Sequence, residues 1–109
     1  MKSRIVLYES AQEDITHIYQ YYAGISELTA HRFLDAMNNM WDQLLLFPFI
    51  GSLRYTFATE LADVRFFRLA DFPYIIFYKV DEGLIVIIRC IHARTDILAA
   101  FGALQTPLD

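Results

Sequence analysis

The chain lacks several features on which common functional sites depend. Its one cysteine, Cys90, excludes an internal disulfide and fits a reducing compartment. No apolar run approaches the roughly 20 residues that span a bilayer, and the opening residues do not resemble a signal peptide. There is no glycine-rich phosphate loop, and no Ser/His/Asp set has a recognisable spacing. We therefore expect a cytoplasmic protein with no membrane segment and no cofactor.

Positive charge is also scarce and unevenly placed. Nine lysines and arginines stand against 13 acidic residues, which gives a net charge of −4. Phosphate contacts need surplus positive charge, so direct DNA binding is not expected. Residues 1–53 hold three basic and six acidic groups, whereas residues 54–96 hold six of each. The arginines therefore gather in the C-terminal half.

Apolar residues, by contrast, are abundant, at 56% of the 109 residues. A chain of this length forms one domain, here residues 1–109, with a single core. So small a domain has little interior, and it cannot hide all of this apolar surface. We expect part of the surface to be exposed or covered by a partner.

The first half predicts a short strand and a helical hairpin. Arg4–Glu9 alternates like a strand, and Ser10 with Glu13 has the spacing of a capping box that opens a helix. Residues 23–26 break that helix, and Ser26 can cap a second one. The second helix ends at residues 47–48, because proline disfavours helical geometry in the residue before it.

The second half predicts three strands joined by short turns, followed by a short terminal helix. The strands are Asp63–Leu69, Tyr74–Val80 and Leu84–Arg94, and the helix runs from Asp96 to Leu104. Strands joined by tight turns are antiparallel. The fold class is α+β: an N-terminal strand, a helical hairpin, and then a mostly antiparallel sheet, in the order β-α-α-β-β-β-α.

The last strand carries the candidate site. Five apolar residues open it, which is typical of a strand buried on both faces, and polar groups appear at its end. Alternation predicts two faces, one with Val86, Ile88, Cys90, His92 and Arg94 and the other with Ile85, Ile87, Arg89 and Ile91. Arg89 then needs a partner: an ion pair with a helix acid such as Asp14, or a phosphate or partner contact.

His92 allows two interpretations. Beside two arginines it could act as an acid or base on a phosphodiester, or it could simply hydrogen-bond to a nearby loop backbone. His17 and His31 are expected to be solvated on helices. No metal site is predicted, since His92 and Asp96 straddle a strand end. Cys90 is expected to be a buried apolar filler.

The ordered series of motifs resembles the ParE/RelE superfamily of toxins from type II toxin–antitoxin systems, over roughly residues 4–100. It comprises Ala11, Asp14, Ile15, Ile18, Tyr22, Ala30, Phe33, Leu44, Phe47-Pro48, Gly51, Val64-Arg65, Arg68-Leu69, Tyr74, Phe77–Val80, Arg89, His92-Ala-Arg94 and Asp96. The resemblance implies a RelE/ParE-like fold. It also implies an antitoxin (ParD-like) whose flexible segment wraps the toxin, which fits the apolar excess.

Members of the superfamily cut messenger RNA on the ribosome (RelE-like) or poison DNA gyrase (ParE-like). Of the RelE-like cleavage set, Arg68 and Arg94 are present, but Ile75 stands in place of an arginine and Ala100 near a tyrosine position. The ending from Arg89 to Asp96 is similar to ParE-like endings, so plasmid stabilisation through gyrase inhibition is favoured. The residues expected to contact a target or partner are Arg65, Arg68, Arg89, His92 and Arg94.

Two alternatives remain open. The first is a ribosome-dependent endoribonuclease with His92 as acid or base and with Arg68 and Arg94 holding phosphate. The second is a non-toxic member that only binds an antitoxin; the low isoelectric point leaves room for it, since toxins of the superfamily are usually basic.

Overall fold

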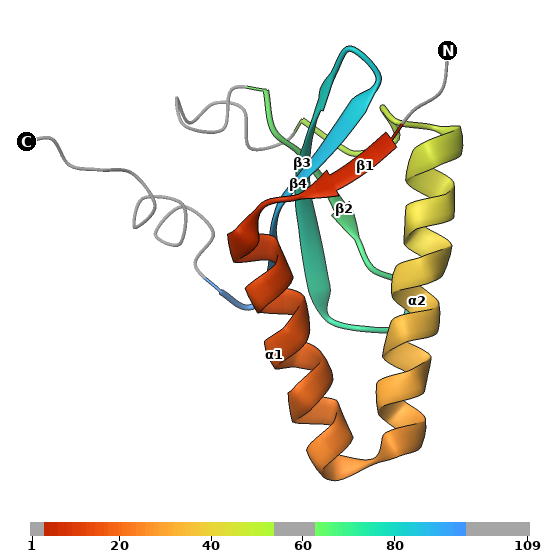
Figure 1. Ribbon diagram of the computed structural model, residues 1–109, viewed down its shortest axis with the longest axis vertical. Coiled ribbons are helices and arrows are strands. Elements are labelled where there is room, and N and C mark those ends of the chain that lie inside the picture. Colours follow the sequence, from red (N-terminus) through yellow and green to blue (C-terminus); the bar gives the residue numbers. More distant parts are fainter. Residues whose placement is uncertain (1–3, 54–62, 96–109) are drawn as a thin grey trace, which may run out of the picture.

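The helical hairpin packs against a four-stranded sheet (Figure 1). The computed structural model describes residues 4–53 and 63–95. The elements are β1 (Arg4–Leu7), α1 (Glu9–Ile25), α2 (Glu27–Leu46), β2 (Arg65–Arg68), β3 (Tyr74–Asp81) and β4 (Leu84–His92). This order confirms the α+β prediction as far as β4. The terminal helix predicted for residues 96–104 lies outside the described residues.

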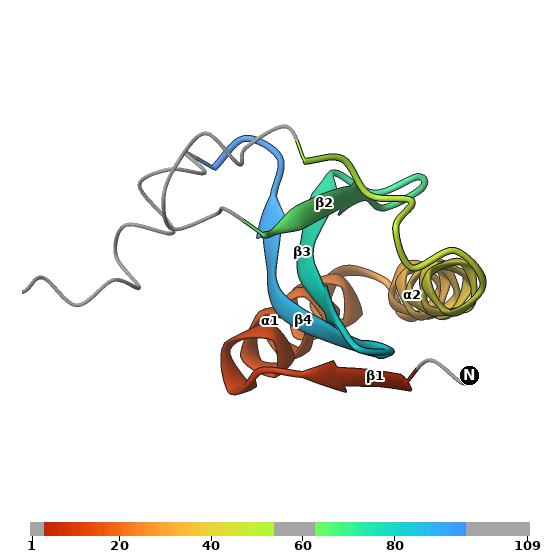
Figure 2. The same cartoon turned by 90° about the horizontal axis from the view of Figure 1, so that it is seen from above.

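The sheet has the strand order β1-β4-β3-β2 (Figure 2). β1 pairs with β4 in parallel, and the other two pairings are antiparallel. The β3–β4 hairpin turns at Glu82 and Gly83, whose φ angles are 50° and 83°. Two positive φ values in a two-residue loop match the right-handed twist of the strands it joins. The predicted tight turn at residues 81–83 is therefore confirmed.

The two helix starts differ in how they are capped. Ser26 caps α2 as predicted, accepting a hydrogen bond from the Thr29 amide at 3.3 Å, and α2 ends at Leu46, just before the Phe47-Pro48 pair. The capping box predicted for α1 is wrong: α1 begins at Glu9, and no side chain caps it. The Ser10 hydroxyl instead donates to the carbonyl of Ile88, 3.0 Å away.

The apolar interior is divided between the two faces of the sheet. On one face, strand side chains join both helices around residues such as Phe33, Leu44 and Tyr78. The other face has a smaller cluster formed by Val64, Ile75, Phe77, Ile88 and Ile91. A sheet buried on both faces needs apolar residues at consecutive positions, which explains the unbroken apolar runs in β3 and β4.

A β-bulge in β4 changes which residues share a face. Phe77 pairs with Arg89 but Tyr78 pairs with Ile87, so Ile88 is an extra residue. Consequently Ile85, Ile87 and Cys90 face the helices, whereas Ile88 and Ile91 lie in the smaller cluster. The strict alternation expected from the sequence is wrong beyond Ile88, because one inserted residue moves every later side chain to the other face.

Candidate functional site

The five predicted contact residues lie on β2, on β4 and just beyond β4. Arg68 is opposite Ile75 on β3, and the next row pairs Tyr74 with His92. Arg68 and His92 are therefore at the same end of the sheet, but β3 runs between their strands. Two strand spacings separate their backbones by about 10 Å. The structure brings these groups to one edge without joining them in a single cluster.

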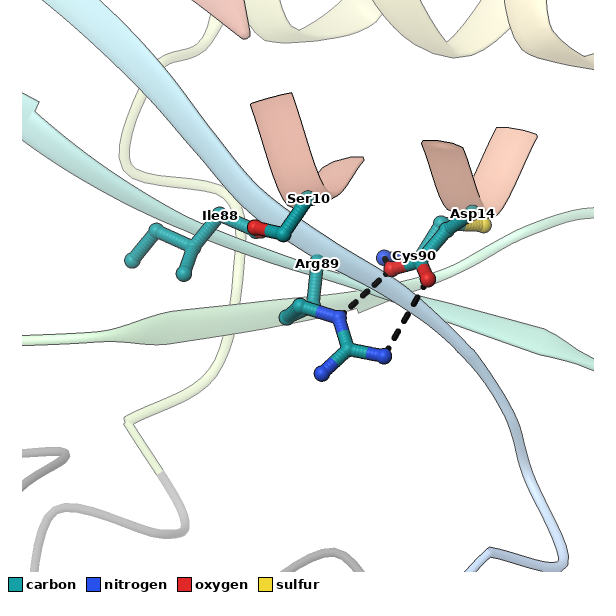
Figure 3. Close-up of polar contacts among 5 residues, drawn as sticks. All are labelled: Ser10, Asp14, Ile88, Arg89 and Cys90. Atoms are coloured by element: carbon teal, nitrogen blue, oxygen red, sulfur yellow. Dashed lines mark hydrogen bonds and ion pairs between the residues drawn. The ribbon is translucent and has the colours of Figure 1, made fainter. Parts of the chain in front are cut away.

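Arg89 is held by Asp14 of α1 (Figure 3). Its Nε lies 2.6 Å from Asp14 Oδ2, and its Nη2 lies 3.1 Å from Oδ1, so the pair is bidentate. Asp14 Oδ2 also accepts the amide of Cys90 at 2.9 Å. The two charged side chains are only 22% and 17% exposed. The predicted ion pair is thus confirmed, and the guanidinium is engaged within the fold.

The same contacts explain why α1 begins where it does. β1 ends at Leu7, so β4 has no neighbouring strand beyond Ile87 on that side. The carbonyl of Ile88 and the amide of Cys90 would be left without partners, and unpaired buried backbone groups are costly. Ser10 and Asp14, four residues apart on one face of α1, supply the missing donor and acceptor (Figure 3).

Arg65 holds the loop that follows α2. Its Nη1 donates to the carbonyls of Phe49 at 3.2 Å and Gly51 at 2.8 Å, and its guanidinium carbon lies 4.9 Å from the centre of the Phe49 ring. The hydroxyl of Tyr78 donates to the Pro48 carbonyl and accepts from the Gly51 amide. Arg65 therefore stabilises the loop, and its guanidinium is less available to a target.

Gly51 is required by this arrangement. An added Cβ would lie 2.6 Å from the Tyr78 hydroxyl oxygen and 2.8 Å from the Phe66 carbonyl oxygen. Such distances force a shift of backbone or of a fully buried ring. The loop is held closely against β2 and β3, and it presents Phe47, Phe49 and Ile50 outward, all at least 47% exposed.

His92 bonds to the turn that follows its own strand. Its Nδ1 accepts the amide of Arg94 at 3.0 Å, and its ring meets that of Tyr74 edge-on at 5.3 Å. Burial raises the pKa of the Tyr74 hydroxyl, so this neighbour stays neutral. The prediction that His92 hydrogen-bonds to a loop backbone is confirmed.

Arg68 and Arg94 are exposed. Arg68 lines a groove of about 650 Å³ between α2 and the β2–β3 turn, which also contains Arg32, Asp35 and Asp71. Arg94 lies in the turn after β4, where its amide bonds to His92. Of the five predicted residues, these two have guanidinium groups without a partner in the described part of the chain, and they are the ones best placed to meet another molecule.

Other reactive groups offer no separate site. Burial raises the pKa of the Cys90 thiol to about 12, so it is an apolar filler as predicted and not a nucleophile. Within residues 4–53 and 63–95, no group of His, Cys, Asp and Glu side chains could hold a metal ion. His17 and His31 are exposed, as expected. None of the described helices is long and apolar enough to cross a membrane.

Large apolar side chains at the surface are the main feature whose positions the sequence motifs do not predict. The composition predicted their existence, and the structure places them at the start of α1, at the hairpin tip, along α2 and in the loop after it. They are Tyr8, Tyr21, Ile25, Leu28, Leu34, Leu45, Leu46, Phe47, Phe49, Ile50 and Leu53. So much exposed apolar surface on a small protein is typical of a binding surface.

Taken together, the fold and surface define a small α+β protein with a helical hairpin on a mixed sheet and with exposed apolar and arginine side chains. A solved structure described as the chromosomal ParDE TA system from P. aeruginosa has the same fold. The TM-score is 0.60 at 17% identity, over 85% of this chain and 98% of that one. A search of curated proteins found no match.

The family itself follows from the sequence. The family model described as the ParE toxin of the type II toxin–antitoxin system parDE matches residues 5–97. This range spans both helices and nearly all of the sheet. The chain belongs to the ParE toxin family of type II toxin–antitoxin systems.

Proposed function

We propose that this protein inhibits DNA gyrase in the cytoplasm and is neutralised by its own antitoxin, a ParD-like protein. The observation that carries the proposal is the family match over residues 5–97, which implies an antitoxin partner. Inhibition would arise from binding, with the toxin holding gyrase in an unproductive state. The antitoxin would prevent this by covering the toxin.

The candidate ribonuclease residues support a gyrase target over messenger RNA. Ile75, at the position of an arginine in the RelE-like pattern, is 7% exposed and lies in the smaller core cluster. His92 Nδ1 is occupied by a backbone amide, and β3 separates His92 from Arg68. Cleavage of RNA needs a base, an acid and cations around one phosphate. Here one of the cation positions of the RelE-like pattern is occupied by the apolar Ile75.

The exposed arginines are the residues we assign to the target. Arg68 and Arg94 are exposed at one end of the sheet. Arg65 and Arg89 are bonded within the fold, so replacing them would act through stability. In our proposal Arg68 and Arg94 contact gyrase directly, whereas Arg65, Arg89 and His92 stabilise the fold around them.

The antitoxin would cover apolar surface. The exposed apolar residues of α2 and the following loop form a nearly continuous segment of sequence, from Leu45 to Leu53. A flexible antitoxin segment that folds on binding could bury many separate apolar side chains at once. This explains how a small domain tolerates such a surface, since it would be covered whenever the pair is intact.

The test is a supercoiling assay with purified gyrase, relaxed plasmid, ATP and toxin freed of antitoxin. We expect supercoiling to be lost and linear, protein-linked DNA to accumulate, and added antitoxin to reverse both. The double variant Arg68→Ala, Arg94→Ala should fold but lose inhibition. Lys79→Ala, a cation near the far end of β3, is the matched control. Normal supercoiling at large excess of folded toxin would refute the gyrase target, and cleaved transcripts after induction would favour the ribonuclease.

A further inference from the structure

β1 has the composition of an inner strand but the position of an edge strand. Ile5 and Leu7 face the helices, and Val6 faces the other side of the sheet. A strand with apolar residues on both faces is typical of the middle of a sheet. Yet β1 is the last strand of the sheet, and Figure 2 shows it on the outside of the molecule, beyond β4.

The outer edge of β1 has free hydrogen-bonding groups. The amide of Arg4 bonds to the Gly83 carbonyl and that of Tyr8 to the Ile87 carbonyl, each at 2.9 Å. In a parallel pair, alternate residues face the neighbouring strand, so residues 4, 6 and 8 face β4. The N–H and C=O groups of Ile5 and Leu7 therefore point outward. Within the described chain they have no partner.

A groove lies on each side of this edge. On the helix side lies a groove of about 720 Å³ between β1, α1 and α2. It is lined by seven apolar residues, Ile5, Leu7, Ile15, Leu34, Met37, Trp41 and Leu45, and by three polar ones, Gln12, Thr16 and Asn38. On the opposite side, a groove of about 690 Å³ contains Val6, Tyr8, Leu84 and Val86, together with the charged residues Asp63, Arg65, Lys79 and Asp81. A strand added beside β1 would place alternate side chains over these two grooves.

We propose that a second copy of this chain occupies this edge, with the two β1 strands pairing antiparallel about a twofold axis at Val6. Ile5 of one copy would then face Leu7 of the other, and the reverse pair would form by symmetry. These residues carry the outward backbone groups, so two hydrogen-bonded pairs would form. The two four-stranded sheets would become one continuous sheet.

The occupant is argued from self-complementarity. The groove on the helix side is lined mostly by apolar residues, and the opposite groove presents Val6, Tyr8, Leu84 and Val86. A strand that is apolar on both faces fits both, and β1 is such a strand. Its charges also match, because antiparallel pairing brings Arg4 opposite Tyr8 and next to Glu9 of the other copy. No lysine, proline or bulge interrupts the edge within residues 4–7.

Cross-linking tests the register. Residues that face each other in a non-hydrogen-bonded antiparallel pair have Cα atoms about 4.5 Å apart, within disulfide range. Val6→Cys should therefore cross-link to itself under mild oxidation with copper phenanthroline. Ile5→Cys, which faces residue 7, should not. Native Cys90 is 3% exposed and should give no background.

Sedimentation of the antitoxin-free protein tests the dimer itself. Ile5→Pro removes an outward N–H that β4 does not use, and proline is tolerated at such edge positions. We expect it to raise the dimer dissociation constant at least tenfold relative to Ile5→Ala, about 1.4 kcal/mol. Circular dichroism would verify that both variants fold.

Two results would overturn the proposal. One is a native protein that stays monomeric at the highest attainable concentration. The other is cross-linking of Val6→Cys no faster than that of a cysteine at the exposed position Gln20. If this edge paired only with the antitoxin, the antitoxin-free protein would stay monomeric, which is the first of these two results. Because gyrase inhibition is read in a separate assay, failure of the dimer would leave the proposed function standing.

Discussion

Removing Asp14 should destabilise the fold more than removing its partner Arg89. Asp14→Ala loses three hydrogen bonds, two to the guanidinium and one to the Cys90 amide. Arg89→Ala loses two and leaves the third in place. Breaking a buried ion pair costs about 3–5 kcal/mol, and an exposed pair contributes about 0–1 kcal/mol. Side chains that are 22% and 17% exposed lie between these limits.

We therefore expect a loss of about 3 kcal/mol for Asp14→Ala and about 2 kcal/mol for Arg89→Ala. The double variant should lose less than the sum, with a coupling energy of about 1–2 kcal/mol. Urea unfolding followed by circular dichroism measures the stability of all four proteins in this double-mutant cycle: the native protein, the two single variants and the double variant. Asp35→Ala, an exposed acid on α2, is the matched control and should change stability by less than about 0.5 kcal/mol.

Two outcomes would refute this reasoning. Coupling below about 0.5 kcal/mol would mean that the pair behaves as a solvated surface contact. An Arg89→Ala loss equal to or larger than that of Asp14→Ala would mean that the bond from Asp14 to the β4 backbone contributes nothing. Comparing the two single variants thus separates the contribution of the ion pair from that of the hydrogen bond between Asp14 and the β4 backbone.

Three further predictions concern other contacts. Gly51→Ala should lose about 2–4 kcal/mol in urea unfolding because its Cβ overlaps neighbouring atoms, whereas Gly24→Ala, with open space in α1, should be neutral or gain up to about 1 kcal/mol. Ser10→Ala should lower the free energy of unfolding by about 1 kcal/mol, and Glu13→Ala should lower it much less. Equal losses would mean that the two side chains do form a capping box. The free energy of unfolding should fall as pH rises from about 9 towards 12, because the folded Cys90 thiol keeps a proton that the unfolded thiol releases. In urea unfolding measured across this pH range, Cys90→Ala should show a smaller fall.

The sequence predicted the elements well because their signals are local. Ser26, the Phe47-Pro48 pair and the Glu82-Gly83 turn act through their own backbone geometry, and the structure confirms each. Arg89 was also predictable, since a charge within an apolar strand needs a partner and Asp14 was available. Each of these inferences needs only neighbours in sequence or one strong physical requirement.

What could not be predicted depends on residues distant in sequence. Ser10 has a capping residue's spacing, but a carbonyl 78 positions away accepts its hydrogen bond. The bulge at Ile88 has no glycine to mark it, and it reverses the faces expected for the end of β4. The role of Arg65 depends on how the loop after α2 folds back over β2. These arrangements arise from tertiary packing, which local patterns do not contain.

The parallel pairing of β1 with β4 has a consequence for synthesis of the chain. Arg4 pairs with Leu84, so the first strand is made long before its neighbour. At translation rates of about 5–20 residues per second, β1 would wait about 4–16 s for β4. During that time an apolar segment near the N-terminus has no strand to pair with. The nascent chain therefore carries an exposed apolar segment until its last strand has been made.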